Sequence, residues 1–206
     1  PKSSKSIERR HFQNRLAGEV STEDKLRVLA AVAGAGPEAS NAVPAIVSLL
    51  SAGHQALRTS AIYTLAAVGA AAIPALVQAL ETAGECEAAG ADPLDFDYVA
   101  IPGKVSNPGG AILIHDAAYA LAAIGRSAVD SLGGLLNCPY EWTRINAAFA
   151  LGEMDSTAAA AVPALEKLLN DESHYVIRVA TYALGTIRTD APLASLSRLL
   201  NANRPG

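Results

Sequence analysis

Aromatic side chains are scarce in this chain: they make up 5% of its 206 residues, although hydrophobic residues make up 50%. The apolar content is therefore mostly Ala, Leu, Val and Ile. Ala and Leu favour helices, and the small Ala side chain lets neighbouring helices approach closely. The composition argues against a β-sandwich or barrel and favours an all-α protein built from packed helices.

Cysteine is equally rare. The two thiols, Cys86 and Cys138, have neither a Cys-x-x-Cys spacing nor the spacing of metal ligands. They exclude a disulfide framework and suit a reducing compartment. The chain also lacks the apolar core of a secretory signal and any uncharged apolar run of about 18 residues that would cross a membrane. We therefore expect a cytoplasmic protein with no cofactor and no membrane partner.

An excess of basic charge is missing too. The net charge is −4, so we do not expect the surface as a whole to bind nucleic acid. The charges are uneven along the chain: residues 1–27 carry seven basic and four acidic side chains, and residues 81–98 carry six acidic and no basic ones.

What the chain does contain is an internal repeat. Four segments share an Ala-x-x-x-Leu core with another apolar residue three positions later, which is the i, i+4, i+7 spacing of one helix face. The Ala positions are Ala61, Ala117, Ala147 and Ala180, and the Leu positions are Leu65, Leu121, Leu151 and Leu184. Each unit alone would expose an apolar stripe, so we expect the units to stack on one another.

A second helix is expected after each of these segments. Three such helices begin with Pro-Ala-Leu or Pro-Ala-Ile, at Pro44, Pro74 and Pro163, because proline is tolerated in the first turn of a helix. Two more take the same place without the proline, at 130–136 and 194–200. We predict an α-solenoid, or superhelix, of about five helix pairs over residues 21–206, preceded by a capping helix or tail in residues 1–20.

The period is broken once, by a long insertion that we place at residues 83–110. Leu121 follows Leu65 by 56 residues, whereas the next two repeat leucines follow after 30 and 33. A loop of this length is functional or disordered more often than a short one. Its embedded Phe96 and Tyr98 favour a lid or a partner anchor, with an inert excursion and disorder as the alternatives. Its aspartates lack the spacing of a calcium loop, so we interpret them as solvated.

These segments resemble the HEAT-like repeat family, in particular the short bacterial subtype with the pattern Val-Arg-x-x-Ala-x-x-Ala-Leu-Gly. The pattern is present as Leu57-Arg58…Ala61…Leu65, as Arg144…Ala147…Ala150-Leu151-Gly152, and as Val176-Ile-Arg178…Ala183-Leu184-Gly185, where the arginine is displaced by one. The resemblance covers roughly residues 22–200 outside the insertion. It implies a scaffold or adaptor; the family also includes phycobilin lyases and chromophore-handling proteins of cyanobacteria, but no lyase-specific signature is present.

Two patterns that suggest chemistry fail in their context. Gly34–Ala39 matches G-x-G-x-x-A, but it follows a helical pattern and not a strand, so we expect a helix end and a turn. The four histidines form no metal-binding or protease spacing. His115, beside Asp116 at the end of the insertion, is the best single candidate for acid–base chemistry or ligand contact, with a surface histidine as the alternative.

The recurring arginines Arg58, Arg144 and Arg178 have two interpretations. The favoured one is a structural ladder in which each pairs with an acid or a carbonyl of a neighbouring repeat. The other is an anion-binding row. Trp142, in the predicted loop before a helix, is either a binding hot spot or a cap on the core between repeats.

Four aromatic residues precede the repeat leucines by two positions: Tyr63, Tyr119, Phe149 and Tyr182. They are expected to line one face, either as core packing or as a recognition surface. Since no nucleophile–base pair, phosphate loop or metal cluster is found, we expect a non-catalytic module that binds a protein partner or a covalently linked domain. The alternative is an enzyme-associated role, as a bilin-lyase-like protein or a regulatory domain.

Overall fold

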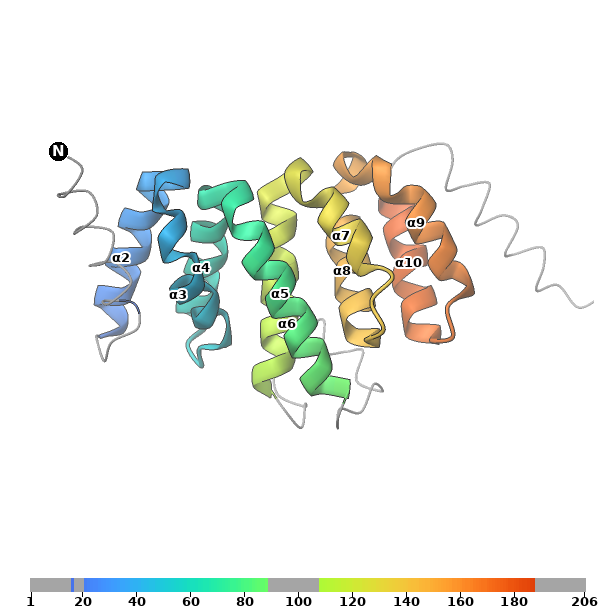
Figure 1. The fold of residues 1–206 in the computed structure, drawn as a ribbon, viewed down its shortest axis with the longest axis horizontal. Helices are drawn as coiled ribbons and strands as arrows, with labels where there is room; N and C mark the ends of the chain where they lie inside the picture. Colours follow the sequence, from blue (N-terminus) through green and yellow to red (C-terminus); the bar gives the residue numbers. More distant parts are fainter. Residues whose placement is uncertain (1–15, 17–20, 89–107, 188–206) are drawn as a thin grey trace, which may run out of the picture.

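The described part of the protein consists of helix pairs packed side by side. Figure 1 shows that the first and second helices of the pairs form two layers. The computed structural model describes residues 16, 21–88 and 108–187. The layer of first helices contains α2 (Thr22–Ala35), α4 (Gln55–Val68), α6 (Pro108–Ile124), α8 (Glu141–Glu153) and α10 (His174–Thr186). The layer of second helices contains α3 (Val43–Ser48), α5 (Ile73–Ala88), α7 (Val129–Leu135) and α9 (Val162–Lys167). The described residues contain no strand, so the predicted all-α solenoid is confirmed.

Short 3-10 helices connect these elements. Those within a pair are η1 (Gly36–Ala42), η3 (Gly69–Ala72), η5 (Gly125–Ala128) and η6 (Asp155–Ala161), and those after a second helix are η2 (Leu49–Ser51) and η7 (Leu168–Asn170). The expected prolines lie in the first turn of α3 and α9, where the backbone N–H would have no helical partner anyway.

One backbone position recurs after the first helix of each of the first four repeats. Gly36, Gly69 and Gly125 have φ of 55°, 73° and 81°, and the fourth repeat places Asp155 there with φ 50°. This left-handed conformation reverses the chain into the second helix, and only glycine adopts it without a steric cost. The segment Gly34–Ala39 is thus a helix end and a turn, as expected.

Asp155→Gly is expected to raise the free energy of unfolding by about 1 kcal/mol, because it removes the strain of a Cβ in the left-handed region. The reverse change, Gly69→Ala, should lower it by about 1 kcal/mol; no other atom lies within 4 Å of the added Cβ, so the loss would report the backbone alone. Urea unfolding followed by circular dichroism measures both. A loss of stability in Asp155→Gly would mean that the aspartate side chain contributes more than its backbone costs.

The core lies between the two layers and is made by the repeat register. Ala61, Ala117, Ala147 and Ala180 are fully buried, and so are the repeat leucines Leu65, Leu121, Leu151 and Leu184. The alanines let the first helices pack closely, and the leucines fill the space beneath them. Leu16 is helical and buried in the same core; the rest of the predicted cap in 1–20 lies outside the described residues.

The helices extend into the predicted insertion from both sides. Helix α5 continues to Ala88 and α6 begins at Pro108, so the ends of the 83–110 segment are helical where we predicted a loop. Residues 89–107, with Phe96 and Tyr98, and the second helix of the fifth pair lie outside the described residues. Within the described part, one stretch, Gln55–Thr82, is long and apolar enough to cross a membrane. In the fold it is two helices, α4 and most of α5, joined by η3.

Candidate functional site

Three aromatic rings stack across the layer of first helices, and we call Tyr119, Phe149 and Tyr182 the aromatic row. The ring centroids of Tyr119 and Phe149 are 5.6 Å apart in an edge-to-face arrangement. Those of Phe149 and Tyr182 are 6.0 Å apart with an interplanar angle of 14°. The rings come from α6, α8 and α10. Both geometries are favourable for aromatic pairs, so the predicted line of rings is present over these three helices.

Tyr63 does not join the aromatic row. It is 69% exposed on α4 and has no ring contact with another described residue. Tyr63 and Tyr119 occupy the same position of the repeat, but only the Tyr119 ring contacts other described rings.

His115 extends the aromatic row at the α6 end. Its ring lies 4.6 Å from that of Tyr119 and 6.5 Å from that of Phe149. Its Nδ1 is 3.1 Å from Asp116 Oδ1, and Asp116 Oδ2 accepts from Arg58 Nε at 3.0 Å. Asp116 on α6 therefore contacts both the His115 ring and Arg58 of α4. The described contacts of the ring are thus two aromatic side chains and a carboxylate, and none of them is a Ser, Thr or Cys side chain.

A carboxylate, Glu153 on α8, lies beside the tyrosines of the aromatic row. The Tyr182 hydroxyl donates to Glu153 Oε1 at 2.7 Å, and this hydrogen bond, followed by burial and the carboxylate charge, raises the pKa of Tyr182. Burial raises the pKa of Tyr119 above its ordinary value, and the charges of Glu153 and Asp116 raise it further. Both phenols therefore stay protonated at neutral pH and can donate hydrogen bonds.

Two more aromatic residues lie seven positions before members of the aromatic row. Trp142 precedes Phe149 on α8, and Tyr175 precedes Tyr182 on α10, so each pair lies on one helix face about two turns apart. Both side chains are half-buried and pack against the core. Trp142 lies inside the first turn of α8 and not in a loop as predicted. Tyr175 was missed by sequence reasoning, although its i, i+7 spacing to Tyr182 would have shown it.

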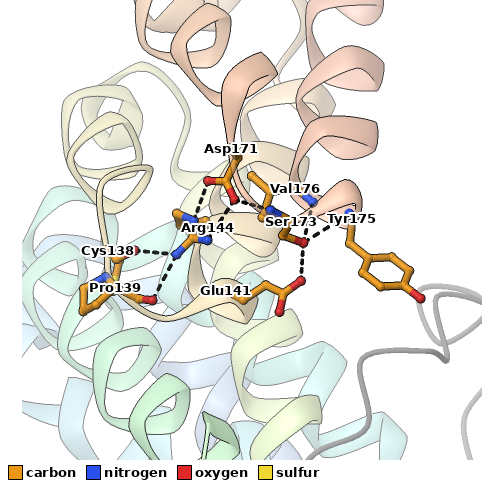
Figure 2. Close-up of polar contacts among 8 residues, drawn as sticks. All are labelled: Cys138, Pro139, Glu141, Arg144, Asp171, Ser173, Tyr175 and Val176. Atoms are coloured by element: carbon orange, nitrogen blue, oxygen red, sulfur yellow. Dashed lines mark hydrogen bonds and ion pairs between the residues drawn. The ribbon is translucent and has the colours of Figure 1, made fainter.

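Arg58 and Arg144 form the predicted structural ladder. Each donates through Nη1 to the carbonyl six residues earlier, Ala52 O at 2.9 Å and Cys138 O at 3.0 Å. Arg144 also donates to Pro139 O and to Asp171 Oδ1, both at 3.0 Å, while its Nε lies 2.9 Å from Asp171 Oδ2. Figure 2 shows its guanidinium between Asp171 on one side and the backbone of Cys138 and Pro139 on the other. These side chains are occupied and do not form an anion-binding row.

The acid partner differs between the two repeats. Asp171 lies thirteen residues before the repeat leucine Leu184, and the position thirteen before Leu121 is Pro108, which has no carboxylate. In the repeat that follows the insertion, the acid comes instead from Asp116 inside α6. Arg178, displaced by one residue, has its guanidinium 5.5 Å from the ring centroid of Tyr175.

A cleft of about 440 Å³ opens between the first turns of α8 and α10. Its lining includes Glu141, Glu172, His174 and Tyr175. Ser173 caps α10 by accepting from the backbone N–H groups of Tyr175 and Val176, and its hydroxyl donates to Glu141 (Figure 2). The serine is thus a capping residue. Within the described ranges, no cluster of three or more His, Cys, Asp or Glu is arranged to hold a metal ion.

Comparisons with known proteins agree with the repeat. The profile for HEAT repeats matches residues 129–206, and that for the PBS lyase HEAT-like repeat matches residues 57–82. No curated protein matches the chain. Among solved structures, the crystal structure of an engineered protein is similar at 20% identity and a TM-score of 0.41, over 94% of this chain and 85% of that one.

Proposed function

Because this chain belongs to the HEAT-like repeat family, we propose that it is a non-catalytic scaffold or adaptor that binds a protein partner through the face carrying the aromatic row. The partner is a separate protein or a covalently linked domain. One observation carries the proposal: rings from three successive helices stack into a continuous surface that is not withdrawn into the core, and Tyr182 at its end is 45% exposed.

Energetics support a binding role for this surface. Tyr and Trp are enriched among the residues that contribute most to protein–protein affinity, because they bury a large area while losing little side-chain entropy. The rings already hold one another in place, so little further ordering is needed when a partner binds. Trp142 and Tyr175 widen the same face along α8 and α10.

The chemistry of the described residues favours a non-catalytic role. Of the carboxylates nearest the aromatic row, Asp116 forms an ion pair with Arg58, and one oxygen of Glu153 accepts from the Tyr182 hydroxyl. Nucleic acid is disfavoured as the partner, because Arg58 and Arg144 are consumed in ion pairs and the net charge is −4.

The test is affinity capture from a lysate of the source organism, followed by quantitative mass spectrometry. A double variant, Phe149→Leu with Tyr182→Ser, removes two rings while leucine keeps the half-buried site of Phe149 filled. We expect proteins retained by the wild type to fall by about tenfold or more, since truncating hot-spot residues costs about 2 kcal/mol or more.

Tyr63→Ser is the control, because it removes a ring on α4 that is even more exposed than Tyr182 but lies outside the aromatic row. Circular dichroism establishes that both variants are folded. Equal capture by the wild type and the double variant would refute the proposal, and so would an equal loss in Tyr63→Ser.

The second candidate is a chromophore-handling role, which the match to the PBS lyase HEAT-like repeat over residues 57–82 favours. That match covers one helix pair, α4 and α5, and describes the repeat and not a site. Visible absorbance of the protein purified from its source tests this role. A bound chromophore would support the chromophore-handling role and contradict the proposal of a plain scaffold.

A further inference from the structure

We infer that the aromatic row receives an arginine side chain from a basic segment of the partner protein, with the guanidinium against the tyrosine rings and paired with Glu153. This inference rests on the proposed function and specifies the chemistry of its partner. It starts from Glu153, the carboxylate that accepts a hydrogen bond from Tyr182.

Glu153 lies between the two tyrosines of the aromatic row. It follows Phe149 by four residues on α8 and is exposed on the same side of that helix. Tyr182 on α10 donates to its Oε1, and its charge also acts on the phenol of Tyr119 on α6. No described residue donates to its second carboxylate oxygen, which can therefore accept from a donor of another protein.

Among the described residues, the two carboxylates near the aromatic row differ in whether they have a cationic partner. Asp116 has Arg58 at 3.0 Å. In the described part of the chain Glu153 has no basic group within 4.0 Å. An aromatic surface with an unpaired anion at its edge has a negative potential from two sources, the carboxylate and the faces of the rings.

A guanidinium can interact with the Glu153 carboxylate and with the ring faces at the same time. It stacks on aromatic faces, and it donates hydrogen bonds to a carboxylate in a fixed planar fork, which an ammonium does not. The same helix face already contains such a contact: the Arg178 guanidinium lies over the Tyr175 ring of α10. The net charge of −4 further favours the approach of a basic segment.

The experiment measures fluorescence anisotropy of three labelled peptides with a common Gly-Ser backbone, carrying arginine, lysine or glutamate at the same positions. The wild type should bind the arginine peptide best, bind the lysine peptide more weakly and not bind the glutamate peptide. Glu153→Gln should weaken arginine-peptide binding by about tenfold. Glutamine keeps the acceptor for the Tyr182 hydroxyl, so the geometry of the row is maintained.

Glu81→Gln is the matched control. It removes the same charge from an exposed site on α5, in the other helix layer, and should leave binding unchanged. Equal binding by Glu153→Gln and the wild type would overturn the inference, as would equal binding of the glutamate peptide. No binding of the arginine peptide at up to about 1 mM would overturn it too.

The two proposals fail separately. If the captured proteins depend on Phe149 and Tyr182 but not on Glu153, the aromatic row is a docking surface for a partner without the proposed arginine. If capture does not depend on the rings at all, the proposed function fails first.

Discussion

Arg144→Met is expected to lower the free energy of unfolding by about 3–5 kcal/mol, the cost of breaking a buried ion pair by removing one partner. The side chains of Arg144 and Asp171 are 9% and 10% exposed. Methionine fills the space of the stem, but it removes the counter-charge of Asp171, which keeps only the hydrogen bond from the Ser173 N–H. It also leaves the carbonyls of Cys138 and Pro139 without the guanidinium donor. Urea unfolding followed by circular dichroism and by the fluorescence of Trp142 measures the change.

Arg178→Met is the matched control, because it is the arginine of the same repeat pattern displaced by one residue. Its side chain is exposed over Tyr175, so its replacement should cost no more than about 1 kcal/mol. Combining Arg144→Met with Asp171→Asn should cost less than the sum of the two single changes, since it no longer leaves a buried charge unpaired. Similar losses in Arg144→Met and Arg178→Met would contradict the structural role of Arg144.

Gly152→Ala is expected to destabilise the protein by about 1–2 kcal/mol, although alanine is the better helix former. A Cβ at Gly152 would lie 3.1 Å from Ala183 Cα and 3.2 Å from both Thr186 Oγ1 and Tyr182 Cε1. The Cα belongs to the backbone of α10 and cannot move alone, so α8 and α10 would be forced apart. The Thr186 hydroxyl, which donates to the Gly152 carbonyl at 3.0 Å, would also be displaced.

Gly185→Ala provides the comparison, because both glycines follow a repeat leucine directly. No other atom lies within 4 Å of a Cβ at Gly185, so there the helix preference acts alone and should stabilise by about 0.5–1 kcal/mol. Thermal unfolding of the two variants measures the difference. If both changes stabilised the protein, the two helices would not be in tight contact at Gly152.

The aromatic row shows which features of the candidate site can be predicted from the alignment of the repeats. Register places Tyr119, Phe149 and Tyr182 at one level of successive helices, and the structure stacks them. The same register includes Tyr63, which remains separate. The repeat register also does not predict the hydrogen bond between Glu153 and Tyr182, because the two residues are 29 positions apart and lie on different helices. Local spacing predicts which side of a helix a residue occupies, whereas contacts between helices depend on their separation and on side-chain rotamers.

The sequence by itself determined the solenoid, because helix propensity and the i, i+4, i+7 pattern are local properties, and a repeated apolar stripe has to be buried against its neighbours. It also determined the buried Ala and Leu positions and the presence of rings on one face. Only the tertiary structure decided that Arg144 pairs with Asp171, that Gly152 is in tight contact while Gly185 is not, and that Glu153 lies beside the aromatic row. These depend on the distance between neighbouring helices, which no single repeat encodes.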